Sequence, residues 1–97
     1  MGYQIVLAEQ AVQDFRQLSA RDRSTIRDAL ERHLRHEPAK ESRSGIKRLR
    51  GIARPQYRLR VGDFRVFYDL AEDSVEVLAI VPKTRAAEWL KSIGGQS

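Results

Sequence analysis

The feature that most constrains the fold is a pair of alternating runs joined by a glycine-aspartate step. Along residues 57–61, and again along residues 64–70, every second side chain is apolar, which is the period of a strand that buries one face. Gly62-Asp63 between the two runs is a typical two-residue hairpin turn. The sequence therefore predicts an antiparallel hairpin in which Arg60 stands directly opposite Arg65.

The N-terminal part of the chain predicts one strand and two helices. Residues 3–8 alternate as a short strand, and apolar residues then recur at three- and four-residue spacing over residues 8–18. A second helix with the same spacing is expected to begin at Ser19, whose hydroxyl suits an N-cap, and to end before Pro38. These two helices form a helical hairpin directly after the first strand.

The rest of the chain predicts a long loop, a central strand and a final helix. Residues 37–56 lack a period except for a short extended piece at residues 46–49, whereas residues 75–81 are nearly apolar on both faces, as in a central strand. Residues 85–93 form a short helix that Gly94-Gly95 would end.

A chain of 97 residues has room for one hydrophobic core. We expect a single α+β domain over residues 1–97. An N-terminal strand and a two-helix hairpin pack on an antiparallel sheet of about four strands, followed by a short C-terminal helix.

Positive charge is concentrated in the middle of the sequence. The formal net charge is +5, yet residues 40–65 hold nine basic and two acidic side chains, which leaves the two flanking parts near neutral or acidic. In the predicted hairpin Arg58, Arg60 and Arg65 share one face, although like charges opposite one another destabilise a strand pair. Guanidinium groups match phosphate geometry, so a nucleic acid is the natural ligand.

A plainer interpretation is that these arginines only keep one sheet face hydrated. Phe67, Leu78 and Ile80 are expected on the same face, which would make it partly apolar and favours a binding surface. The loop before the hairpin extends the basic track through Lys47, Arg48, Arg50 and Arg54.

Other candidate sites are weaker. His33 and His36 lack a third metal ligand nearby, so we expect them to be exposed residues at a helix end. Trp89 is more typical of a core or groove anchor than of a platform for base stacking. The absence of cysteine excludes disulfides and thiolate chemistry. No leader or membrane-spanning stretch is apparent, so a cytoplasmic protein is expected.

Three segments together resemble the RelE/ParE superfamily of bacterial toxins from type II toxin–antitoxin systems. They are Lys47-Arg-Leu-Arg-Gly51, Tyr57-Arg-Leu-Arg-Val-Gly-Asp-Phe-Arg-Val-Phe-Tyr68, and Val75-Glu-Val-Leu-Ala-Ile-Val81 with the basic segment after it. The resemblance covers nearly the whole chain and implies a RelE-like fold. It also implies a cognate antitoxin protein that covers the basic face, and any oligomer would form through the toxin–antitoxin heterocomplex.

RelE-like members cut messenger RNA on the ribosome without a metal or cofactor, by attack of the ribose 2′-hydroxyl on the adjacent phosphate. The resemblance implies catalytic roles for Arg58 and Arg60 on the first hairpin strand, for Arg65 after the turn, and for Arg85 after the last strand. Residues expected to bind RNA or the ribosome are Lys47, Arg48, Arg50, Arg54, Lys83 and Trp89.

The chain departs from the RelE-like pattern at the step of proton transfer. Such enzymes usually carry lysines where this sequence has Arg58 and Arg60, and an arginine is a poor general base because its pKa exceeds about 12. They also often carry a tyrosine or histidine in the last helix, where this chain has Trp89 and Leu90. Two alternatives therefore stay open, a ParE-like inhibitor of DNA gyrase and a non-catalytic RNA-binding relative.

Overall fold

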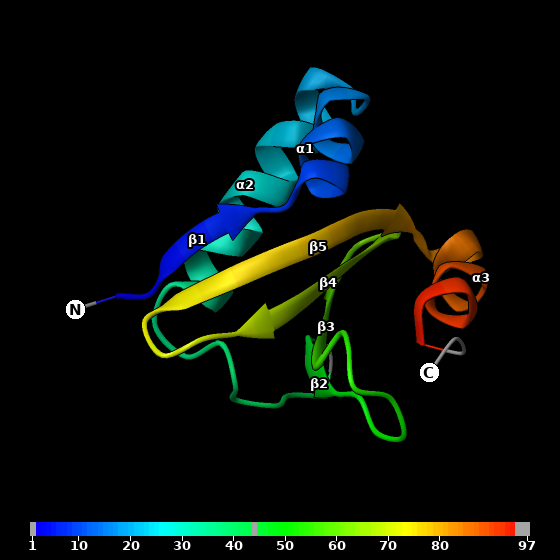
Figure 1. Ribbon diagram of the computed structural model, residues 1–97. Helices are drawn as coiled ribbons and strands as arrows, with labels where there is room; N and C mark the ends of the chain where they lie inside the picture. Colours follow the sequence, from blue (N-terminus) through cyan, green and yellow to red (C-terminus); the bar gives the residue numbers. More distant parts are fainter. Residues whose placement is uncertain (1, 44, 95–97) are drawn as a thin grey trace.

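The computed structural model describes residues 2–43 and 45–94 of the chain (Figure 1). In chain order its elements are β1 (Gln4–Leu7), α1 (Glu9–Arg16), α2 (Ala20–Leu34), β2 (Ile46–Arg48), β3 (Tyr57–Val61), β4 (Phe64–Leu70), β5 (Ser74–Pro82) and α3 (Lys83–Gly94). The strands form one sheet in the order β1-β5-β4-β3-β2. Within the described residues no helix is long and apolar enough to cross a bilayer.

The predicted α+β architecture is confirmed, with one difference in the sheet. The expected sheet had about four strands with the N-terminal strand packed on it, whereas the described sheet has five because β1 pairs with β5 in parallel. The physical reason is that β5 is largely buried on both faces and therefore needs a hydrogen-bonding partner along each edge. The helical hairpin of α1 and α2 begins directly after β1 (Figure 1).

Local signals fix the ends of several elements. The Ser19 hydroxyl accepts a hydrogen bond from the Asp22 backbone N–H at 3.1 Å, which is the N-cap expected at the start of α2. Gly62 has a φ of 55°, a left-handed conformation that favours glycine, and it closes the β3–β4 hairpin. The α3 helix ends at Gly94, and Gly95, the other proposed stop residue, lies outside the described residues.

The sheet separates two clusters of buried side chains. Leu59, Val66 and Tyr68 belong to the larger cluster, which includes residues of α1 and α2. On the other face Phe67 and Ala79 form a smaller cluster that α3 covers. The sheet is therefore covered by helices on both faces, with the α1–α2 hairpin on one side and α3 on the other (Figure 1).

A β-bulge in β5 corrects one expectation about these faces. Phe67 pairs with Ala79, but the next residue, Tyr68, pairs with Val77, so Leu78 is an extra residue in the ladder. The alternation shifts by one beyond this point, and Ile80 packs in the larger cluster on the helical-hairpin side. Phe67 does share the face of the arginines, because it pairs directly with Arg58, but the prediction that Ile80 lies there was wrong.

Candidate nucleic-acid interface

Four basic residues occupy one face of the β2–β3–β4 half of the sheet, and we call them the cationic face: Lys47, Arg58, Arg60 and Arg65. Lys47 pairs with Arg58, and Arg60 pairs with Arg65, so each pair projects from the same side of the sheet. This is the side opposite the α1–α2 hairpin, because Leu59 between Arg58 and Arg60 points into the larger core cluster. The predicted clustering of three arginines is thus present in the structure, and Lys47 joins it.

Arg58 is the most enclosed member of the cationic face. One of its terminal nitrogens lies 3.5 Å from the Gly45 carbonyl oxygen, and its Nε atom is buried without a hydrogen-bond partner among the described residues. Burial lowers the pKa of Arg58, and the nearby charges of Arg60 and Arg65 lower it further. A desolvated cation without a counter-charge costs folding free energy, and an anion bound there would offset that cost.

The other two arginines differ in how far they are held in place. Arg65 folds back over the turn, where its Nη1 donates to the carbonyl oxygens of Gly62 at 3.0 Å and Phe64 at 2.9 Å. Arg60 is exposed near the end of β3, where the end of the strand also borders a pocket of about 290 Å³ that reaches round to α2. Arg65 is therefore the positioned group, whereas Arg60 has an open surface around it.

Arg48 and Arg54, two of the other cations predicted to bind RNA, are engaged in contacts of their own. Arg48 lies on the opposite side of β2, with its guanidinium carbon 5.2 Å from the centre of the Tyr57 ring. Arg54 forms ion pairs with Asp69 at 2.7 Å and Glu76 at 3.4 Å, and this raises the pKa of Arg54, mainly through its hydrogen bond to Asp69. These contacts secure the loop before β3 to β4 and β5.

Two further cations lie at the periphery. Arg50 is exposed in the loop after β2. The Lys83 ammonium lies 3.6 Å from the Asp63 carboxylate, which joins the start of α3 to the hairpin turn.

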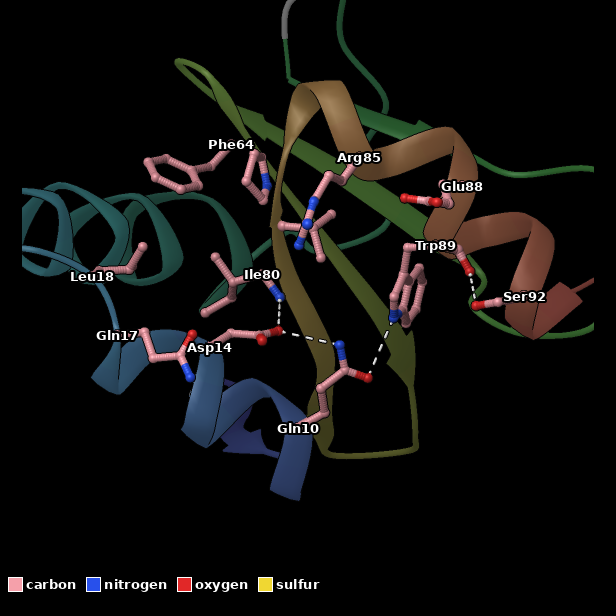
Figure 2. Close-up of a pocket in the computed structure, with 12 residues that line it drawn as sticks. Gln10, Asp14, Gln17, Leu18, Phe64, Ile80, Arg85, Glu88, Trp89 and Ser92 are labelled. Carbon is pink, nitrogen blue, oxygen red and sulfur yellow. Dashed lines mark hydrogen bonds between the residues drawn. The ribbon is translucent and has the colours of Figure 1, made fainter.

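Arg85 occupies a separate cleft of about 590 Å³ between α1 and α3 (Figure 2). In this view Arg85 extends from α3 into the cleft, whose wall also includes Asp14 and Trp89. None of the four residues of the cationic face lines the cleft. The structure thus brings together three of the four arginines predicted to be catalytic and leaves Arg85 apart from them.

Trp89 is an anchor for α3. Its ring stacks on Phe67 with a centroid separation of 4.9 Å, and its Nε1 donates to the Gln10 side-chain oxygen at 3.3 Å. One face of the indole ring is therefore covered by Phe67, as the anchor interpretation of Trp89 requires.

Asp14 is a residue of this cleft that the sequence analysis missed. One of its carboxylate oxygens accepts a hydrogen bond from the Ile80 backbone N–H at 2.9 Å (Figure 2). The β1 strand ends at Leu7, which pairs with Val77, so β5 continues beyond its partner and Asp14 satisfies a donor on that open edge. The only available sequence signal was an acidic residue in an amphipathic helix, which is too common to be informative.

Comparison with known proteins assigns the chain to a protein family. Taken together, the fold and its basic sheet face define a small α+β protein of the RelE-like kind. Residues 5–87 match the family model described as the ParE toxin of the type II toxin–antitoxin system parDE, and the chain belongs to this family. No curated protein matches the chain.

Solved structures of RelE proteins share the fold. The free toxin RelE of Escherichia coli, in a mutant form, has a TM-score of 0.73 at 24% identity and covers 99% of this chain and 97% of its own. RelE in the RelE–RelB complex of Pyrococcus horikoshii has a TM-score of 0.65 at 26% identity, and the match covers 88% of this chain and 99% of the Pyrococcus chain. The corresponding complex of Methanococcus jannaschii has a TM-score of 0.65 at 18% identity. The match covers 87% of this chain and 96% of the Methanococcus chain.

Proposed function

We propose that this toxin is a metal-independent, ribosome-dependent endoribonuclease that cuts messenger RNA and thereby inhibits translation in the cytoplasm. The observation that carries the proposal is the cationic face, where Arg58 is partly buried beside Arg60 and Arg65, with its Nε atom unpaired and no acidic partner among the described residues. Charge that is not neutralised within the protein is suited to an anion supplied from outside. Messenger RNA supplies the phosphodiester and the 2′-hydroxyl that this reaction requires.

The arginines would act on the charge that develops at phosphorus. Attack by the 2′-hydroxyl produces a pentavalent phosphorane whose non-bridging oxygens carry more negative charge than those of the substrate. Guanidinium groups fixed before the reaction stabilise that charge, usually the largest single contribution to catalysis. Arg65 is suited to this task because its contacts with the Gly62 and Phe64 carbonyl oxygens hold it in place.

We further propose that a cognate antitoxin covers the cationic face. The Pyrococcus and Methanococcus structures are of RelE with the antitoxin RelB, and a protein that neutralises this face would need acidic or carbonyl groups opposite Arg58 and Arg65. The antitoxin and the RNA would then compete for the same arginines.

The test is to express the chain from a tightly repressed promoter and to map the 5′ ends of cellular messenger RNA within minutes of induction. New ends inside coding regions, in register with codons and absent when translation is blocked, are the expected result. Purified toxin added to ribosomes that carry a defined message should produce the same ends. Intact messages in arrested cells would refute the proposal.

Inhibition of DNA gyrase is the second candidate, because the matching family model is that of ParE toxins. It predicts intact messages, induction of the DNA-damage response and loss of supercoiling activity when the purified chain is added to gyrase. The same induced cultures therefore separate the two candidates.

A further inference from the structure

The cationic face can stabilise charge, but its arginines cannot readily transfer protons. A guanidinium group gives up a proton only above about pH 12, whereas an alkylammonium group is a usable acid. RNA cleavage by the 2′-hydroxyl leaves a 5′-alkoxide, a strongly basic group whose departure is accelerated by protonation. The proposed reaction thus requires an acid that Arg58, Arg60 and Arg65 do not supply.

The strand register places one ammonium group in this position. Lys47 on β2 is the cross-strand partner of Arg58 on β3, and side chains directly opposite one another have Cβ atoms about 4.5–5.5 Å apart. Arg58 pairs in turn with Phe67, so these three side chains form one row across the sheet. A phosphate held by Arg58 would therefore lie within reach of the flexible Lys47 side chain.

The surroundings of Lys47 leave its ammonium group available. It is exposed on the outer strand of the sheet. Lys40 and Lys83 have carboxylate partners, Glu37 at 3.8 Å and Asp63 at 3.6 Å, whereas Lys47 forms no ion pair within residues 2–43 and 45–94.

We propose that Lys47 is the general acid of the cleavage reaction, an inference that rests on the proposed ribonuclease function. The 2′-oxygen forms a bond to phosphorus and its proton passes to solvent water. The bond from phosphorus to the 5′-oxygen breaks, and that oxygen takes a proton from Lys47 Nζ. The products are a 2′,3′-cyclic phosphate and a 5′-hydroxyl, and Lys47 regains its proton from solvent.

The test uses a leaving group that needs no proton. Single-turnover cleavage is measured on ribosomes carrying a message with either the natural linkage or a 5′-bridging sulfur at the position that the wild-type protein cuts. A thiolate leaves without an acid because a thiol has a pKa near 8.5. Lys47→Arg keeps the charge and removes the acid, and Lys40→Arg is the matched control, as an exposed lysine engaged with Glu37 in a different segment.

We expect Lys47→Arg to slow cleavage of the natural linkage by about 10²–10⁴-fold, the usual contribution of general acid catalysis. Its rate on the sulfur linkage should lie within a few-fold of the wild-type rate, and Lys40→Arg should match the wild type on both. An unchanged rate of the Lys47→Arg variant on the natural linkage would overturn the role of Lys47 as the acid and would leave the ribonuclease function standing. Equal losses on both linkages would also overturn it, because they would indicate a role in binding. Failure of the wild-type protein to cut either message would instead refute the ribonuclease function.

Discussion

Arg60 and Arg65 are directly paired across the β3–β4 hairpin, where two guanidinium groups share one position of the ladder. Like charges at such a position repel each other, and the neighbouring Arg58 adds a third charge. A hairpin selected for stability alone would carry an opposite charge or a β-branched residue at one of these positions. The pairing therefore indicates that the cationic face serves binding at some expense of stability.

Replacing Arg60 by Thr should increase the free energy of unfolding by about 0.2–1 kcal/mol at low salt, because the repulsion from Arg65 is removed. Urea denaturation at low and high ionic strength measures the change. The gain should shrink as salt screens the charges. A variant less stable than the wild type at low salt would show that Arg60 makes favourable contacts that outweigh the repulsion.

Arg65→Ala should abolish toxicity, because it removes the arginine that the turn carbonyl groups of Gly62 and Phe64 hold in place. Colony formation after induction and mapping of messenger 5′ ends provide the measurement. Arg21→Ala, at an exposed position on α2, is the control and should remain toxic. Full toxicity of the Arg65 variant would contradict the assignment of the cationic face.

Arg58→Met should reduce the response of the fold to oxyanions. The wild-type protein has a desolvated guanidinium group without a full set of partners, so sulfate should raise its melting temperature more than chloride does at matched ionic strength. Sulfate also stabilises proteins in general, and the Met variant reports that general effect. Calorimetry should show that sulfate raises the melting temperature of the variant clearly less than that of the wild type. Equal increases in melting temperature would argue against an anion site at Arg58.

Tyr68→Phe should lower the free energy of unfolding by roughly 1 kcal/mol, since the buried hydroxyl donates to the Pro38 carbonyl oxygen at 2.7 Å. Burial raises the pKa of Tyr68 above its ordinary value of 10.0, with a smaller contribution from Tyr57. A raised folded-state pKa gives stability that is complete below the unfolded-state pKa and is lost as pH rises above it. Urea denaturation should therefore show a loss of stability above pH 10 in the wild type that is smaller in the variant.

Glu31→Gln tests the ion pair at the end of α2. The hydrogen bond from Arg35 lowers the pKa of Glu31 below its ordinary value of 4.5. The stability that the ionised Glu31 contributes is present above its unfolded-state pKa and disappears as pH falls through the lower folded-state pKa. The wild type should be the more stable protein at pH 7, and the difference should vanish in acid. A difference that persisted at pH 2 would point to a cause other than the charge of Glu31.

The hairpin could be predicted from sequence because its determinants are local. Gly62 between two alternating runs fixed both the turn and the pairing of Arg60 with Arg65, and the structure confirms that register. The cap at Ser19 is equally local and is also confirmed. Elements of this kind are specified by neighbouring residues, so reading a single segment is sufficient.

The remaining features depend on partners that are distant in sequence. Arg54 meets Asp69 and Glu76, which are 15 and 22 residues away, and nothing in the loop itself indicates that pairing. The position of Lys47 beside Arg58 required the pairing of β2 with β3, across a long loop that fixes no register. The nearly apolar run in β5 likewise gave no sign of the bulge, because alternation cannot be followed where both faces are buried.

The bulge at Leu78 allows Val77 and Ile80, which are three residues apart, to face the same side of the sheet. Deletion of Leu78 would remove the bulge and leave Val77, Ala79 and Ile80 in ordinary alternation, with the same pairing partners on β4. Ile80 would stay on the side of the α1–α2 hairpin and Val81 on the side of α3, so α3 would still follow the strand on the same face of the sheet. Relatives should therefore differ in length at the bulge more readily than elsewhere in the strand, where a one-residue change would reverse the side chains beyond it.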